Sequence, residues 1–120
     1  MRKLIFPLIF IVLVACSETK RSHTETAQIV VESFYNQNNS QLEEYTTPGI
    51  YQSYISVQDG MTDGKSGKSN FSVVQDTVYG DTAWVKFSSS YADRPETFKL
   101  IRQDGQWKVT ETGLRERSPF

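Results

Sequence analysis

The chain has 120 residues, with 13 basic and 14 acidic side chains and a formal net charge of −1. This length supports one small domain. The basic residues form no stripe that could hold a polyanion, so the composition argues against a nucleic acid partner.

The first residues have the layout of a bacterial secretory signal. A basic start precedes twelve apolar residues, 4–15, whereas a membrane-spanning helix needs about 20. The junction Leu13-Val14-Ala15-Cys16 resembles the lipobox of bacterial lipoproteins. The resemblance implies cleavage between Ala15 and Cys16, removal of the signal peptide 1–15 and acylation of Cys16.

Acylation of Cys16 would make this a membrane-anchored protein of the bacterial cell envelope. A diacyl or triacyl cysteine carries the more than one chain that stable anchoring requires. Cys16 is the only cysteine, so a disulfide within the chain is excluded. Ser17, rather than an aspartate, follows the cysteine, which favours the outer membrane. Residues 16–21 are the lipidated cysteine and a polar stretch that we expect to be a flexible tether.

The domain itself is predicted to span residues 22–113 and to begin with helices. Ser22 and Glu25 form a capping box. Behind it an apolar stripe has helical spacing, and the helix should end within Asn36–Asn39. The stripe consists of Ala27, Val30, Val31, Phe34 and Tyr35.

Two shorter helices should follow. Ser40 and Glu43 form a second capping box, and this helix should end before Pro48. Pro48 can open a third helix that ends near Asp59-Gly60. The inward face of the third helix would consist of Ile50, Tyr51, Tyr54 and Ile55.

From Asn70 the apolar period changes to two, which predicts β-strands. The strands are expected at 71–79, 82–91, 96–102 and 106–112, with turns at Gly80-Asp81 and Asp104-Gly105, and 114–120 forms an unassigned tail. The predicted fold class is α+β: N-terminal helices on a curved four-stranded antiparallel sheet, with the first helix across the concave side. The expected core is Val30, Val31, Phe34, Leu42, Tyr54, Phe71, Val85, Phe87, Leu100, Trp107 and Val109.

Two hairpin sequences carry a family resemblance. "YGDTAWVKF" at 79–87 and "LIRQDGQWKVTE" at 100–111 resemble the small cystatin-like lipoprotein domains of the nuclear-transport-factor-two-like superfamily, over roughly residues 25–112. The resemblance implies a cone-shaped fold with a pocket between helix and sheet. Some members use this pocket for isomerase, cyclase or dehydratase chemistry, and others only bind ligands or dimerise, so the fold does not decide the function.

The candidate pocket residues are Tyr35, Tyr54, Asp76 and Tyr91. Tyrosines can place hydroxyls within apolar walls, as small-molecule pockets require. Their alternative role is that of core residues whose hydroxyls reach water. Asp76 lies between Val74 and Val78 in a strand and is the best candidate for a catalytic acid or base, with Tyr35 or Tyr54 as the hydrogen-bond donor. The alternative is that Asp76 lies on the outer side of the strand or on a bulge near the turn.

Nucleotide, metal and cofactor sites are not expected. The glycine- and lysine-rich stretch 59–70 lacks the spacing of a phosphate-binding loop and precedes a strand instead of a helix. The only histidine, His23, is expected at the surface, and no run of metal ligands is present in the sequence.

The sequence leaves three functions open. The first is a non-catalytic envelope lipoprotein that binds a small apolar ligand or an envelope protein. The second is an isomerase- or cyclase-like enzyme that uses a pocket carboxylate and a tyrosine. The third is a structural or immunity-type protein that acts through protein contacts alone.

Overall fold

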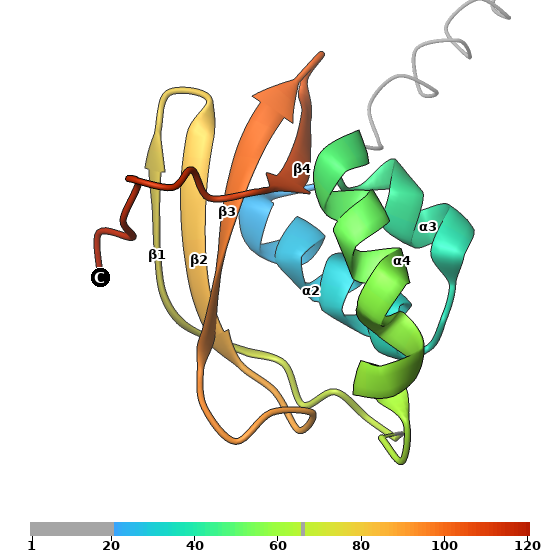
Figure 1. The fold of residues 1–120 in the computed structure, drawn as a ribbon. Helices are drawn as coiled ribbons and strands as arrows, with labels where there is room; N and C mark the ends of the chain where they lie inside the picture. Colours follow the sequence, from blue (N-terminus) through green and yellow to red (C-terminus); the bar gives the residue numbers. More distant parts are fainter. Residues whose placement is uncertain (1–20, 66) are drawn as a thin grey trace, which may run out of the picture.

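The computed structural model describes residues 21–65 and 67–120. It confirms the α+β class: three helices pack on one antiparallel sheet with the strand order β1-β2-β3-β4 (Figure 1). The predictions for the leader 1–15 and for Cys16 lie outside the described residues. Within those residues, no helix has the length and apolar character needed to cross a membrane.

The helices are α2 (His23–Tyr35), α3 (Asn39–Glu44) and α4 (Pro48–Thr62). The capping box that opens α2 is formed as predicted, by Ser22 and Glu25. The second predicted capping box is not used, because the Asn38 side chain accepts the hydrogen bond from the Gln41 amide and caps α3 instead. Ser40 therefore lies inside α3.

Helix α4 is longer than predicted and continues past Gly60. Nothing lies within 4 Å of the position that a side chain at Gly60 would occupy, so this glycine has no packing role. Two polar residues in the second half of α4, Gln58 and Thr62, are buried. The continuation of α4 therefore brings its last turns into contact with the rest of the domain.

The strands are β1 (Ser72–Tyr79), β2 (Thr82–Ser88), β3 (Glu96–Gln103) and β4 (Gln106–Thr110). Strand β2 ends three residues before the predicted limit, because the chain there leaves the sheet. The Ser90 amide donates to the Ser69 carbonyl over 2.7 Å, which ties this segment to the connector between α4 and β1.

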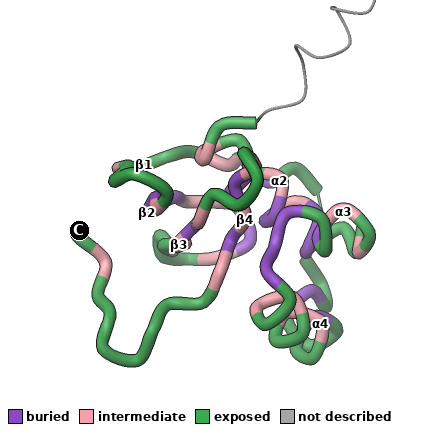
Figure 2. Tube along the Cα trace, turned by 90° about the horizontal axis from the view of Figure 1, so that it is seen from above, coloured by how far each residue is buried: buried purple, intermediate pink, exposed green. Residues whose placement is uncertain are grey.

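The core lies between α2 and one face of the sheet. Nine of the predicted core residues are buried, whereas Tyr54 and Phe71 are partly buried and pack against the core from its edge. Figure 2 shows that buried residues lie along α2 and the inner strands, and that most residues of β1 and of the C-terminal tail are exposed. The buried predicted residues are Val30, Val31, Phe34, Leu42, Val85, Phe87, Leu100, Trp107 and Val109.

The connection between α3 and α4 covers the β4 edge of the sheet. The Thr47 amide donates to the Val109 carbonyl, and the Val109 amide donates to the Tyr45 carbonyl, each over 2.9 Å. The start of α4 is thereby fixed against β4. Strand β1 forms the opposite edge and has no neighbour on its outer side among the described residues.

The C-terminal tail crosses the sheet face that α2 does not cover (Figures 1 and 2). Lys99 points to this face, because its neighbour Leu100 is in the core, and it forms an ion pair with Glu116 of the tail. The tail, for which the sequence predicts no helix or strand, is therefore tied to the outer side of the sheet.

Candidate functional site

A cavity of about 250 Å³ lies between α2, α4 and β3. Its lining is mostly apolar or aromatic, with one carboxylate and two tyrosines. Helix α2 contributes its second half, α4 contributes its inward face, and β3 contributes its first residues. The lining residues are Val30, Val31, Phe34, Tyr35, Tyr54, Met61, Glu96, Thr97 and Phe98.

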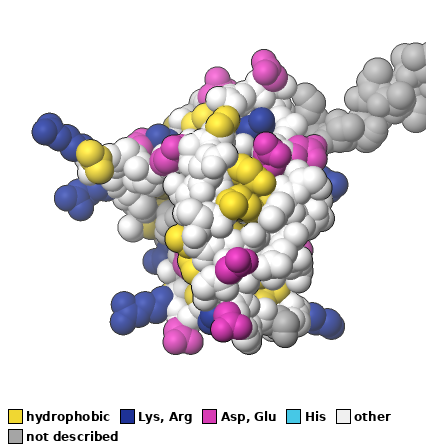
Figure 3. Space-filling view, turned by 45° about the vertical axis from the view of Figure 1, so that its right-hand side comes forward, with side chains coloured by type: hydrophobic (Ala, Val, Ile, Leu, Met, Phe, Trp, Pro, Cys, Tyr) yellow, Lys and Arg dark blue, Asp and Glu magenta, His cyan; other side chains and the backbone are white. Residues whose placement is uncertain are grey.

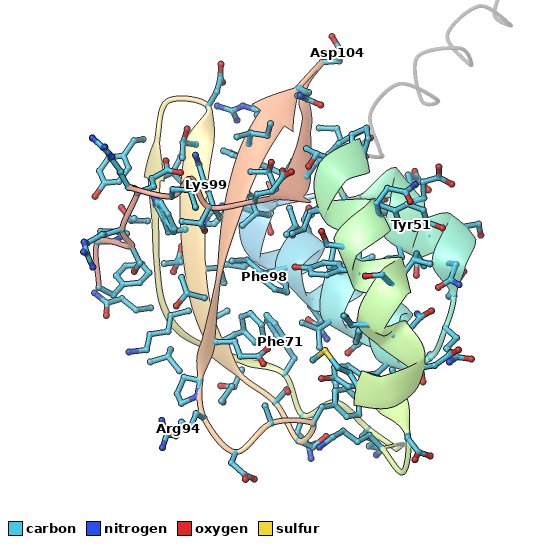
Figure 4. All side chains as sticks on the ribbon, viewed as in Figure 1. Tyr51, Phe71, Arg94, Phe98, Lys99 and Asp104 are labelled. Atoms are coloured by element: carbon cyan, nitrogen blue, oxygen red, sulfur yellow. The ribbon has the colours of Figure 1, made fainter. Side chains whose placement is uncertain are left out.

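Strand periodicity brings Glu96 to the cavity. Glu96, Phe98 and Leu100 alternate along β3, so they share the face that packs against the helices. Their register partners in β2 are Phe87, Val85 and Ala83, all of which are buried. In Figure 4 the Phe98 ring points from β3 toward α2 and α4. Glu96 is thus a carboxylate on a face that is otherwise apolar.

The electrostatics of the cavity follow from partial burial. Burial raises the pKa of Glu96 above the ordinary glutamate value. The pKa values of Tyr54 and Tyr35 are also raised. Burial is the larger cause, and the negative charge of Glu96 is the next largest. The tyrosines therefore keep their protons and remain hydrogen-bond donors at neutral pH, and Glu96 holds its proton to a higher pH than an exposed glutamate would.

The polar groups of the cavity have no partners within the described part of the chain. No hydrogen bond there involves the Tyr35 hydroxyl, the Tyr54 hydroxyl or the Glu96 carboxyl, and no ion pair there includes Glu96. Two donors and one carboxyl group are therefore available to a ligand.

Tyr91 lies beside the cavity and is not part of its lining. Its ring stacks on Tyr35, with the ring centroids 4.2 Å apart, and its hydroxyl donates to the Gly67 carbonyl over 2.7 Å. Tyr91 lines a second, polar groove formed by α2 and the connector residues 67–71. It therefore supports one wall of the cavity and holds the connector in place.

Asp76 lies elsewhere in the molecule. It faces the helices opposite Val85, but its Oδ2 atom is 2.6 Å from Nε2 of His23, the first residue of α2. The cavity begins at Val30, seven residues along the same helix, which corresponds to roughly 10 Å. Asp76 and the two cavity tyrosines are thus not brought together.

His23, for which the sequence predicts a surface position, is partly buried in the structure. Besides the contact with Asp76, its ring meets the edge of Trp107 at a centroid distance of 5.8 Å, and its side chain is only 19% exposed. The Arg102 guanidinium lies 4.6 Å from the centre of the same Trp107 ring. His23 therefore links the start of α2 to two strands of the sheet.

Glu96 was missed as a site residue, although the sequence contained a signal for it. The alternation of Glu96, Phe98 and Leu100 places an acid on an apolar strand face, and the sequence has the same alternation of Asp76 with Val74 and Val78. In the structure, an irregularity between Val73 and Gln75 interrupts the β1 alternation, and the tertiary fold decides which acid lines the cavity. In the described parts of the chain, no cluster of three or more His, Cys, Asp or Glu residues could hold a metal ion.

Comparisons with known proteins identify the fold as NTF2-like. The chain is similar to a candidate NTF2-like transpeptidase from Campylobacter jejuni, with a TM-score of 0.60 and 12% identity over 76% of this chain and 100% of the other. It is also similar to a SEC-C motif containing protein from Rhodopseudomonas palustris, with a TM-score of 0.51 and 13% identity over 76% and 79% of the two chains. No family model and no curated protein matched the sequence. At these identities the likeness defines the fold alone.

Proposed function

We propose that this chain is a lipid-anchored protein of the bacterial cell envelope whose NTF2-like domain binds a small, largely apolar ligand in the cavity between α2, α4 and β3. The observation that carries the proposal is the cavity itself. It combines apolar walls with two tyrosines and a glutamate whose polar groups have no partner in the described residues, which is the usual make-up of a small-molecule site.

The size of the cavity limits the ligand. A volume of about 250 Å³ is slightly below the roughly 300–1,000 Å³ typical of sites for drug-sized molecules. The cavity therefore suits a small ligand better than a drug-sized one.

Binding is tested by mass spectrometry of small molecules that co-purify with the full chain. Met61 lines the cavity from α4 and is 45% exposed, so Met61→Trp should obstruct the cavity without burying new bulk in the core. Val57 is one turn away, is also 45% exposed and does not line the cavity, so Val57→Trp is the matched control.

We expect a bound compound in the wild type and in Val57→Trp, and at least about a tenfold lower yield in Met61→Trp. An empty wild-type preparation, or equal occupancy in all three proteins, would count against ligand binding. An empty preparation would instead favour the protein-contact function.

The anchor is supported by the lipobox at Leu13-Val14-Ala15-Cys16. Cys16→Ala should abolish incorporation of labelled palmitate, because the acyl chains require the cysteine sulfur and the amino group that cleavage exposes. Cleavage of residues 1–15 should also fail. Unchanged label in Cys16→Ala would overturn the proposed attachment to the membrane and with it the envelope location.

A second candidate is a proton-transfer enzyme, favoured by the position of Glu96 beside Tyr54. In this case Glu96, in place of Asp76, would take a proton from carbon next to a carbonyl, and a tyrosine hydroxyl would donate a hydrogen bond to the enolate oxygen that forms. Exchange of the α-hydrogens of cyclohexanone in deuterated water, followed by NMR, provides the test. Catalysis predicts acceleration by the wild type and by Glu43→Gln but not by Glu96→Gln, and no acceleration by the wild type would exclude this reaction.

A further inference from the structure

We propose that the ligand of the cavity is a small organic cation, an ammonium group on an apolar body. This inference rests on the proposed function, because it assumes that the cavity is a binding site, and it specifies the charge of the ligand. It is carried by the residues of the cavity, which combine a single ionisable acid with aromatic walls.

The sign of the charge in the cavity is set by Glu96. Among the described residues, no lysine, arginine or histidine lines the cavity. The ion pairs found among the described residues are His23 with Asp76, Lys99 with Glu116, and Arg102 with Asp81, and none of them includes Glu96. A half-buried carboxylate without a counter-ion loses hydration and gains nothing in return. A bound cation would supply the missing counter-charge, whereas an anionic ligand would be repelled.

The aromatic walls favour the same charge. Phe34 meets Tyr35 edge to face at 5.0 Å and Tyr54 edge to face at 5.6 Å, and Tyr54 lies 6.5 Å from Phe98. These rings come from α2, α4 and β3 and line one small space, so a ligand in the cavity lies among aromatic groups on three elements. The faces of aromatic rings are negative and attract cations within about 6 Å of the ring centre.

The tyrosine hydroxyls are compatible with this ligand. Each hydroxyl has lone pairs that can accept a hydrogen bond from an ammonium group.

The outer surface near α3 and α4 has a similar composition. In the view that turns these helices toward the reader, apolar side chains form small patches with acidic side chains beside them (Figure 3). An amine with a hydrocarbon body therefore meets apolar and acidic groups both on that surface and inside the cavity.

The test compares three probes of one shape and different charge: benzylammonium, benzyl alcohol and benzoate. Their affinities for the full chain in a non-ionic detergent are measured by isothermal titration calorimetry, with a detergent blank. We expect benzylammonium to bind at least about tenfold more tightly than benzyl alcohol, and benzoate to bind more weakly than either.

Glu96→Gln removes the charge and nearly keeps the shape of the side chain, and Glu43→Gln makes the same chemical change at an exposed position outside the cavity. The preference for ammonium over alcohol should fall to within about threefold in Glu96→Gln and stay unchanged in Glu43→Gln. The three probes decide the question on the wild type alone if Glu96→Gln does not fold.

The outcomes separate the two proposals. Equal binding of ammonium and alcohol, or a preference that survives Glu96→Gln, would overturn the cation inference and leave the cavity as a binding site. Failure of all three probes to bind, together with an empty preparation from cells, would overturn both proposals.

Discussion

At the scale of single residues, the position of Glu96 determines the chemistry of the cavity. Its carboxyl group lies on a strand face that it shares with Phe98 and Leu100, and burial raises its pKa. A glutamate in such a place costs stability whenever it is ionised. A binding or catalytic role explains why the protein keeps a glutamate at this cost in stability, and a purely structural role does not.

Glu96→Gln should increase stability at neutral pH. The pKa of Glu96 is higher in the folded than in the unfolded chain, so the folded chain holds the proton more tightly. The contribution of Glu96 to the free energy of unfolding is thus largest below the ordinary glutamate pKa and decreases as the pH rises through the raised folded value. Urea unfolding of the wild type and Glu96→Gln should give similar stabilities near about pH 4, and a more stable variant near about pH 7.

Glu43→Gln is the control for this pH dependence, since Glu43 is exposed. The explanation fails if the difference between Glu96→Gln and the wild type is the same at both pH values, or if the wild type is the more stable protein at neutral pH.

Gly49 is a second position of interest, because the Glu111 carboxylate occupies the space that a side chain at residue 49 would need. A Cβ atom on Gly49 would come within 2.1 Å of Oε2 of Glu111, at the first turn of α4. The other oxygen of Glu111 accepts hydrogen bonds from the hydroxyls of Thr47 and Thr110, over 3.3 and 3.0 Å. A methyl group would therefore displace the carboxylate from the start of the helix, where its charge is favourable.

Gly49→Ala should for this reason have opposing effects that depend on Glu111. Alanine favours the helix by about 0.5–1 kcal/mol over glycine, but displacement of Glu111 should reduce the net change to less than about 0.5 kcal/mol. In a Glu111→Ala background the full gain should appear. Equal effects of Gly49→Ala in both backgrounds, measured by chemical denaturation, would contradict the steric coupling.

At the scale of helices and strands, local patterns in the sequence predicted most of the fold. The capping box at Ser22 and the proline at 48 mark the starts of α2 and α4, because both act within a few residues of the chain. One error was local, because Asn38 caps α3 instead of Ser40, and others occurred where distant segments decide. Strand β2 ends early because residue 90 bonds to Ser69, and no local signal reports that contact.

The candidate site was predicted only in part for the same reason. Tyr35 and Tyr54 line the cavity because helical periodicity turns them inward. Asp76 and Glu96 have similar local sequence patterns, but β1 is at the edge of the sheet and β3 is inside it. Both acids face the helices, and which of them lines the cavity depends on strand order and on the part of α2 that each strand meets, both of which are properties of the tertiary fold.

Gln58 fixes α4 relative to the other helices. Its side-chain amide donates to the Phe34 carbonyl at the end of α2 and to the Asn39 side chain at the start of α3, each over 2.9 Å, and the residue is 4% exposed. These bonds hold the helix that carries Tyr54 and Met61 at one wall of the cavity.

Gln58→Ala should destabilise the protein by about 1–3 kcal/mol, because it removes both hydrogen bonds of a buried side chain together with its packed volume. Gln52→Ala, at an exposed position of the same helix, should change stability by less than about 0.5 kcal/mol. Thermal unfolding of both variants measures the difference. Equal effects of the two substitutions would show that Gln58 does not hold α4 in place.

At the scale of the whole molecule, the cavity persists because its walls are fixed independently. Helix α2 is fixed to the sheet by the core and by the contact of His23 with Asp76, and α4 is fixed at its start by the 45–47 segment and later by Gln58. The walls therefore cannot approach one another without breaking buried hydrogen bonds. A preformed site of this kind binds without the cost of ordering its residues.

The most direct test of the account is an NMR titration of the ¹⁵N-labelled full chain with benzylammonium. If the cavity is the binding site, the largest chemical-shift changes will fall on residues 30–35, on Tyr54 and on residues 96–98, and those of Asp76 and Val57 will stay small. Shift changes that gather on β1, that spread evenly over the surface or that are absent at saturating probe would contradict the central claim that this cavity binds a small organic cation.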